Sequence, residues 1–247
     1  MGALLHSFGY PWSILLQVLA IVHLIRRHGA FYWFFIILMG GPIGALIYIV
    51  LEVVPDLGLL HDALTKRARK TRIQHVETTI LDNPSAANYE ELGELYWDQK
   101  EYAKAREAFD RSIAARSDSL HAFYRRGQCA LELGNFADAI PDLARVVSHD
   151  RDYDSYRAAA LLAHAYGQTG EVQAASEFFS EALEFSTTPE TLYHYAAFLK
   201  SQNLTAEARE WAQKLLHKKR TLPRGAVRRE SAWFRKGQAL LKDLGPN

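Results

Sequence analysis

The chain has 247 residues, and its hydrophobic fraction of 49% and charged fraction of 23% are those of a folded protein rather than a disordered one. A net charge of +1 argues against a nucleic-acid binder that works through a basic patch. The single cysteine, Cys129, excludes an intrachain disulfide framework and any multi-cysteine metal site. We therefore expect no cofactor, no metal and no nucleic-acid partner.

Two apolar stretches open the chain, and almost all charged residues follow them. The first runs over 3–25, and the second, 31–54, has Glu52 as its only charge. A helix needs about 20 apolar residues to cross a bilayer. The sequence predicts a transmembrane hairpin over 1–54, whose first span is complete only if Pro11 kinks the helix rather than starting it. Two buried helices of a globular core are the alternative.

Small residues mark the second stretch. Gly40 and Gly44 have the GxxxG spacing at which membrane helices pack closely, within the hairpin or against another subunit. Pro42 removes a backbone donor and should kink the helix. Together with Tyr48, this pattern resembles the two-helix N-terminal membrane segment of bacterial cardiolipin synthases and related phospholipase-D-type proteins. The resemblance covers roughly residues 12–54 and implies a membrane anchor rather than an activity.

Residues 55–85 are predicted to form a basic amphipathic helix, because apolar residues recur there at helical spacing. Its basic residues near the hairpin are Lys66, Arg67, Arg69, Lys70 and Arg72. They outnumber Arg26 and Arg27, so the positive-inside rule places the following body in the cytoplasm, at a bacterial inner membrane. We also expect membrane lipids to contact residues 1–54 and the basic segment 66–72.

The body repeats itself over residues 86–220. Units begin near residues 86, 120, 156 and 189, which gives spacings of 34, 36 and 33 residues. Small residues recur at position 8 (Gly93, Gly127, Ala163, Ala196) and position 20 (Ala105, Ala139, Ala175, Ala208), and position 15 is Lys100, Gly134, Gly170 and Asn203 in turn. This pattern resembles the tetratricopeptide repeat, a pair of helices that pack closely at the small positions. The resemblance implies an all-α solenoid of four repeats with a C-terminal capping helix over 221–247.

The repeat register also predicts which side chains face the concave groove. They are Glu90, Glu94, Trp97, His121, Tyr124, Gln128, Arg157, His164 and Tyr193. We expect these residues to face solvent and to hold a protein or peptide segment, since Trp, Tyr and Arg contribute most to protein interfaces. An ordinary solvated face with incidental aromatics is the alternative.

No catalytic motif accompanies the repeats. The sequence has no glycine-rich phosphate loop, HExxH motif or nucleophile elbow, and the one His-x-Lys sequence, at His217, lacks the aspartate of phospholipase-D chemistry. The sequence therefore predicts a non-catalytic, membrane-anchored scaffold or adaptor that binds a protein through its groove. The alternative is an accessory or regulatory subunit of a lipid-synthesis or envelope-assembly enzyme that acts through the membrane hairpin.

Overall fold

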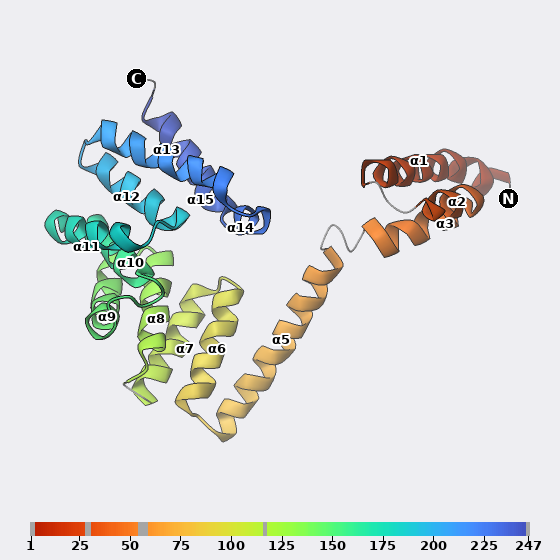
Figure 1. Ribbon diagram of the computed structural model, residues 1–247. Coiled ribbons are helices and arrows are strands. Elements are labelled where there is room, and N and C mark those ends of the chain that lie inside the picture. Colours follow the sequence, from red (N-terminus) through yellow and green to blue (C-terminus); the bar gives the residue numbers. More distant parts are fainter. Residues whose placement is uncertain (1–2, 28–30, 54–58, 116–117, 246–247) are drawn as a thin grey trace. The chain divides into compact units, whose positions relative to one another are not determined.

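The computed structural model describes residues 3–27, 31–53, 59–115 and 118–245, and every regular element among them is helical (Figure 1). The chain divides into two compact units, Met1–Gln74 and His75–Asn247. The boundary falls inside one helix, α5 (Leu59–Asp82), which occupies most of the predicted segment 55–85. Each unit is described by itself.

The first unit is built on α1 (Ala3–Arg27), which packs against two shorter helices. The elements that follow it are α2 (Tyr32–Met39), α3 (Gly41–Tyr48) and a short π-helix, η1 (Ile49–Val53). Leu24, Ile37 and Tyr48 are among the buried residues of its core. The Nε1 of Trp33 donates a hydrogen bond to Glu52 at 3.1 Å. This hydrogen bond offsets part of the desolvation cost of Glu52, the only charged residue of the second apolar stretch, beside the buried Trp33.

The predicted pair of membrane spans is wrong, because no helix among the described residues is both long and apolar enough to cross a bilayer. The second apolar stretch is divided, so that α2 and α3 have eight residues each and rise only about 12 Å. The part of α1 without charged residues ends before Arg26 and contains polar residues, among them Gln17 and His23. The predicted location in an inner membrane, with the repeats on its cytoplasmic side, is overturned with the spans.

Gly40 and Gly44 stand at the break between α2 and α3. Gly41 has a φ of +57°, and Pro42 lies in the first turn of α3, where a missing N–H costs nothing. A Cβ would come within 2.6 Å of the Ile36 carbonyl oxygen at Gly40 and within 2.0 Å at Gly44. The glycines therefore let the end of α2 pass close to α3. This corrects the predicted membrane-packing role, and Pro42 begins a helix instead of kinking one.

The second unit consists of antiparallel helix pairs that follow one another side by side (Figure 1). The pairs are α6 (Ala86–Asp98) with α7 (Tyr102–Ala115), α8 (Leu120–Glu132) with α9 (Phe136–His149), α10 (Arg157–Thr169) with α11 (Val172–Phe185), and α12 (Pro189–Ser201) with α13 (Thr205–Thr221). These four pairs coincide with the four units found in the sequence.

Packing within each pair confirms the repeat register. All four alanines at position 20 are fully buried. A Cβ added to Gly93 would lie 2.7 Å from the Phe109 ring, and one added to Gly127 would lie 3.0 Å from Leu143 Cγ. Small residues at position 8 are therefore what allows the second helix of each pair to approach the first.

The turn residue at position 15 has the same backbone conformation in every repeat. Its φ is 62° at Lys100, 76° at Gly134, 86° at Gly170 and 62° at Asn203. Glycine and asparagine take this left-handed conformation readily, whereas lysine does so at a cost. The turn therefore keeps its geometry even where the sequence departs from the preferred residue.

The predicted capping helix is two helices, α14 (Arg224–Arg229) and α15 (Ser231–Asp243). Phe234, Gly237 and Leu240 are the buried residues of α15, while Ala232 and Ala239 are exposed. Gly237 brings α15 close to α13, since a Cβ there would lie 2.6 Å from Leu215 Cδ2.

Candidate protein-binding site

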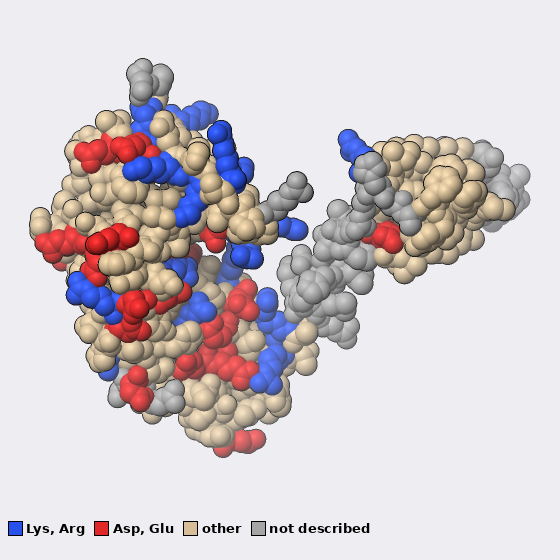
Figure 2. Space-filling view, in the orientation of Figure 1, with Lys and Arg blue, Asp and Glu red and all other residues tan. Residues whose placement is uncertain are grey.

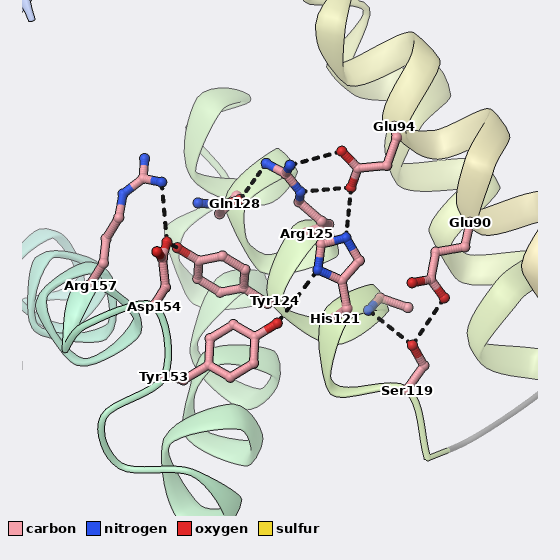
Figure 3. A network of polar contacts seen from close by, with 11 residues as sticks. Glu90, Glu94, Ser119, His121, Tyr124, Arg125, Gln128, Tyr153, Asp154 and Arg157 are labelled. Carbon is pink, nitrogen blue, oxygen red and sulfur yellow. Dashed lines mark hydrogen bonds and ion pairs between the residues drawn. The ribbon is translucent and has the colours of Figure 1, made fainter. Parts of the chain in front are cut away.

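One face of the second unit is lined by the first helices of the repeats, α6, α8, α10 and α12, together with α15; we call it the inner face. Its N-terminal part is organised around Glu94 of α6 (Figure 3). The Glu94 carboxylate accepts hydrogen bonds from Arg125 Nε at 2.7 Å and Nη2 at 2.8 Å, and lies 2.9 Å from His121 Nε2. Burial alone would raise the pKa of Glu94, but the hydrogen bond with His121 and the charge of Arg125 outweigh it and lower that pKa.

A second group of polar contacts joins Tyr124, Asp154 and Arg157 (Figure 3), and Arg157 extends it to Glu190 of α12. The Tyr124 hydroxyl donates to Asp154 at 2.6 Å, and Arg157 donates from Nη1 to Asp154 at 3.4 Å and from Nε to Glu190 at 2.5 Å. The Tyr153 ring packs edge-on against Tyr124, with 5.0 Å between the ring centroids. Burial is the largest cause of a raised pKa at Tyr124, so its hydroxyl stays protonated and donates.

A left-handed turn holds Tyr153 and Asp154 over the inner face. Asp154, Ser155 and Tyr156 have φ values of 51°, 53° and 64°, a conformation that costs roughly 1–2 kcal/mol per residue. The stacking of Tyr156 on Phe185, at 4.5 Å between centroids, and the bonds to Asp154 offset this cost. The turn lies in the longest of the spacings between units, and that extra length is the sequence signal for it.

The predicted groove residues line separate hollows, with Trp97 and His164 in one, His121 in a second and Tyr193 in a third, and not all of them face solvent. Tyr124 is 4% exposed and Gln128 is 3% exposed, because neighbouring side chains cover them. Glu90 accepts a hydrogen bond from the Ser119 hydroxyl at 3.0 Å, and Glu94 is paired with Arg125. The carboxylates of Glu90 and Glu94 are therefore less available to a bound segment than the sequence predicts.

A cavity of about 170 Å³ opens on the inner face between α6, α8, α10, α12 and α15. Trp97, Leu131, Phe136, Leu161 and Trp233 supply its apolar surface. On one wall the rings of His164 and His194 stack with 3.8 Å between their centroids. Trp233 approaches His194 edge-on at 5.1 Å. We call this cavity, with these seven residues, the central cavity.

Both histidines of the central cavity are neutral near pH 7. Burial, with a smaller effect of the Lys236 charge, lowers the pKa of His164 to about 4. Burial and the neighbouring positive charges lower the pKa of His194 well below its ordinary value. The Nδ1 atom of His194 is buried without a hydrogen-bond partner, so a charged form would be poorly solvated.

Charge is unevenly distributed over the second unit. In Figure 2, acidic side chains gather over α6 and α7, and lysines and arginines gather over α13–α15. Near the central cavity, Lys236 of α15 lies 4.1 Å from the Trp233 ring centroid and 5.5 Å from that of Tyr193. In this view the charge of the second unit therefore changes from acidic at its N-terminal end to basic at its C-terminal end.

Sequence reasoning missed several residues of this face: Arg125, Tyr153, Asp154, Trp233 and Lys236. The first is adjacent to a predicted groove residue, at a register position assigned to another face. The next two lie in the loop between units, and the last two lie on the capping helix. Their positions depend on contacts between elements far apart in the chain, which periodicity does not report.

The side chains described on the inner face are of the kinds that bind other molecules. No cluster of three or more His, Cys, Asp or Glu side chains suited to a metal ion occurs in the part of the chain that the structure describes. Burial raises the pKa of the Cys129 thiol to about 12, so this thiol is a poor nucleophile. Paired charges, aromatic rings and a small apolar cavity are the features of a recognition surface.

Comparison with known proteins identifies the repeats. Family models described as tetratricopeptide repeat match residues 75–119, 90–147 and 130–188. Residues 75–188 therefore contain tetratricopeptide repeats. Neither of these models reaches residues 12–54, so the resemblance of that segment to cardiolipin synthases has no support. No curated protein matches the chain.

Solved structures share the fold at low sequence identity. MamA from Desulfovibrio magneticus RS-1 is 18% identical with a TM-score of 0.57, over 66% of this chain and 93% of its own. YrrB, described as a TPR protein with an unusual peptide-binding site, is 18% identical with a TM-score of 0.53, over 76% and 89%. PilF of Pseudomonas aeruginosa is 18% identical with a TM-score of 0.52, over 77% and 86%. These similarities show the helical-repeat fold.

Proposed function

We propose that this protein is a non-catalytic scaffold that binds a segment of another protein on its inner face. The observation that carries the proposal is the central cavity, which lies on the face where the first helices converge and where aromatic and charged side chains gather. Aromatic residues around a pocket, with polar groups at its edge, are the arrangement in which interface energy concentrates. YrrB, which shares the fold, is described as having a peptide-binding site.

The alternative of a subunit that acts through a membrane hairpin loses its basis, because the described residues contain no spanning helix. The scaffold reading needs no such helix. Its binding surface lies within the second unit, His75–Asn247.

A selection of random displayed peptides against the full chain tests the proposal. We expect selected peptides to bind with an affinity that falls at least about fivefold in Trp97→Ala and in Tyr153→Ala, since half-buried interface aromatics contribute about 1–2 kcal/mol each. Fluorescence anisotropy with labelled peptides measures this, and circular dichroism checks that each variant is folded.

The matched control is Glu184→Lys, an exposed position on α11, the second helix of its repeat. It should leave peptide affinity unchanged. If no peptide is selected, or if Trp97→Ala and Tyr153→Ala bind as the parent chain does, the inner face is not the binding surface.

A further inference from the structure

We infer that the central cavity holds one bulky apolar side chain of the bound segment, flanked by an acidic residue that meets Lys236 and a basic residue that meets Glu132. The inference rests on the proposed function and specifies the partner's chemistry. It names a short peptide pattern and the direction in which that pattern lies along the inner face.

The size and lining of the central cavity favour an apolar side chain. An enclosed apolar cavity of about 150 Å³ can hold a benzene ring. This cavity has a similar volume, about 170 Å³, but it is open to solvent and Gln128, Arg157 and Glu190 also line it. Leu131, Leu161 and Phe136 present aliphatic and aromatic carbon, and the stacked rings of His164 and His194 form a wall. An aromatic or a large aliphatic side chain fills this space and buries its surface there.

Apart from Lys236 and Glu132, the charged side chains that line the cavity are paired with one another or with a neighbour. Arg157 reaches its edge but is paired with Glu190 at 2.5 Å and with Asp154 at 3.4 Å. Burial keeps His164 and His194 neutral. A charged side chain placed against the wall formed by the two histidines would therefore be desolvated without a counter-charge there, which disfavours it.

Two unpaired charges of opposite sign lie at the edge of the cavity. The Lys236 ammonium lies over the rings of Tyr193 and Trp233, and no described residue pairs it with a carboxylate. Glu132, at the end of α8, is exposed and likewise has no ion-pair partner among the described residues. A carboxylate and a cation supplied by the bound segment would complete both pairs.

The position of these charges sets the direction of the bound segment. Lys236 belongs to α15, on the basic C-terminal side of the unit, and Glu132 belongs to α8, toward its acidic side (Figure 2). A segment that presents its acidic residue to the C-terminal side and its basic residue to the N-terminal side matches this distribution. The reverse direction places like charges together at both ends.

Peptides selected from the random library against the full chain decide the matter. We expect them to share a bulky apolar residue with an acidic residue on one fixed side and a basic residue on the other. Lys236→Glu should weaken such a peptide at least tenfold, and exchanging the peptide's acidic residue for lysine should restore most of the loss. Lys236 is exposed, so this variant is expected to fold. Glu184→Lys is the matched surface control.

A second variant, Leu131→Trp, fills the cavity from a half-buried position and should weaken every selected peptide at least tenfold. Peptides that depend on Tyr153 but bind Leu131→Trp and Lys236→Glu normally would overturn the inference and leave the proposed function intact. Failure of every inner-face variant to alter binding would overturn both. If Leu131→Trp does not fold, the charge exchange at Lys236 still decides.

Discussion

Lys100 takes the left-handed conformation that glycine takes at the equivalent turn of the second and third repeats. Its φ of 62° is imposed by the tight connection between α6 and α7. Because glycine enters this region without the steric cost of a Cβ, we expect Lys100→Gly to raise the free energy of unfolding by about 0.5–1 kcal/mol. Urea unfolding followed by circular dichroism measures the change.

The neighbouring residue supplies the control. Gln99 has a φ of −85°, in the right-handed region, so Gln99→Gly gains no relief of strain and loses backbone entropy on folding. It should lower the free energy of unfolding. Equal effects of Gly at both positions would show that the backbone conformation of Lys100 carries no cost.

Gly127 tests the packing requirement at position 8. A Cβ there would lie 3.0 Å from Leu143 Cγ and 3.4 Å from Asp142 Cβ, and Leu143 is fully buried. Gly127→Leu should therefore overpack the contact between α8 and α9 and lower the free energy of unfolding by about 1–3 kcal/mol or more. Thermal melting compares the variant with the parent chain.

Gly225, in α14, has open space around its missing Cβ. Gly225→Ala should be neutral or slightly stabilising, since alanine favours helix over glycine. A melting temperature that is unchanged by Gly127→Leu would contradict the assigned repeat register.

At the scale of the helix, the sequence predicts the features that follow from the local periodicity of residue types. The four pairs α6 to α13, their turns and their small positions follow from the recurrence of residue types. The contact of Arg125 with Glu94 does not, because it joins residues 31 apart on adjacent repeats and depends on the rotation of α8 against α6. The position of Lys236 beside the central cavity does not follow either, since the break at Glu230 and the close approach at Gly237 set the orientation of α15.

The first unit shows why an apolar stretch is insufficient evidence for a span. Composition over 31–54 predicts one continuous helix, yet the left-handed Gly41 divides it into α2 and α3. Adjacent glycines can either kink a helix or end it. Which of the two occurs depends on the element against which the residues after the glycines can pack. Here both short helices pack against α1.

The stacked histidines of α10 and α12 predict an acid-sensitive contact between helices. An unfolded histidine has a pKa near 6.5, whereas that of His164 in the folded chain is about 4, so the unfolded state binds more protons between these values. Stability is therefore fully present above about pH 6.5 and is lost as the pH falls toward 4. The loss is at most roughly 3 kcal/mol for His164, with a further contribution of the same sign from His194.

Urea unfolding between pH 7 and pH 5 measures the first part of this loss, about 2 kcal/mol for His164. The range stops at pH 5 because the lowered pKa of Glu94 acts only below its ordinary value of 4.5. The double variant His164→Phe, His194→Phe should make stability nearly independent of pH in that range. His217→Gln, at an exposed position, should retain the parent dependence. A parent chain that is equally stable at pH 7 and pH 5 would show that the pair is solvated.

At the scale of the whole molecule, the boundary between the units divides α5. The first unit exposes many large apolar side chains, among them Met39 at 86% and Phe31 at 74%, whereas the second unit exposes fewer and buries most of its apolar side chains in a series of clusters. Exposed apolar surface of this kind promotes association. A chain that lacks the first unit should therefore associate less in solution, and it keeps the inner face.

The stability of a chain without the first unit depends on whether it keeps the last turns of α5. Residues 75–82 of α5 belong to the second unit, where Val76 is 3% exposed and Glu77 accepts a hydrogen bond from the Tyr96 hydroxyl at 2.5 Å. We expect residues 75–247 to unfold cooperatively in urea with the full helical signal of the unit. A chain of residues 83–247 should be less stable by about 1–3 kcal/mol, since it loses the burial of Val76 and leaves α6 uncovered. Equal stability of the two chains would place the start of the repeat unit at α6 and make the last turns of α5 dispensable.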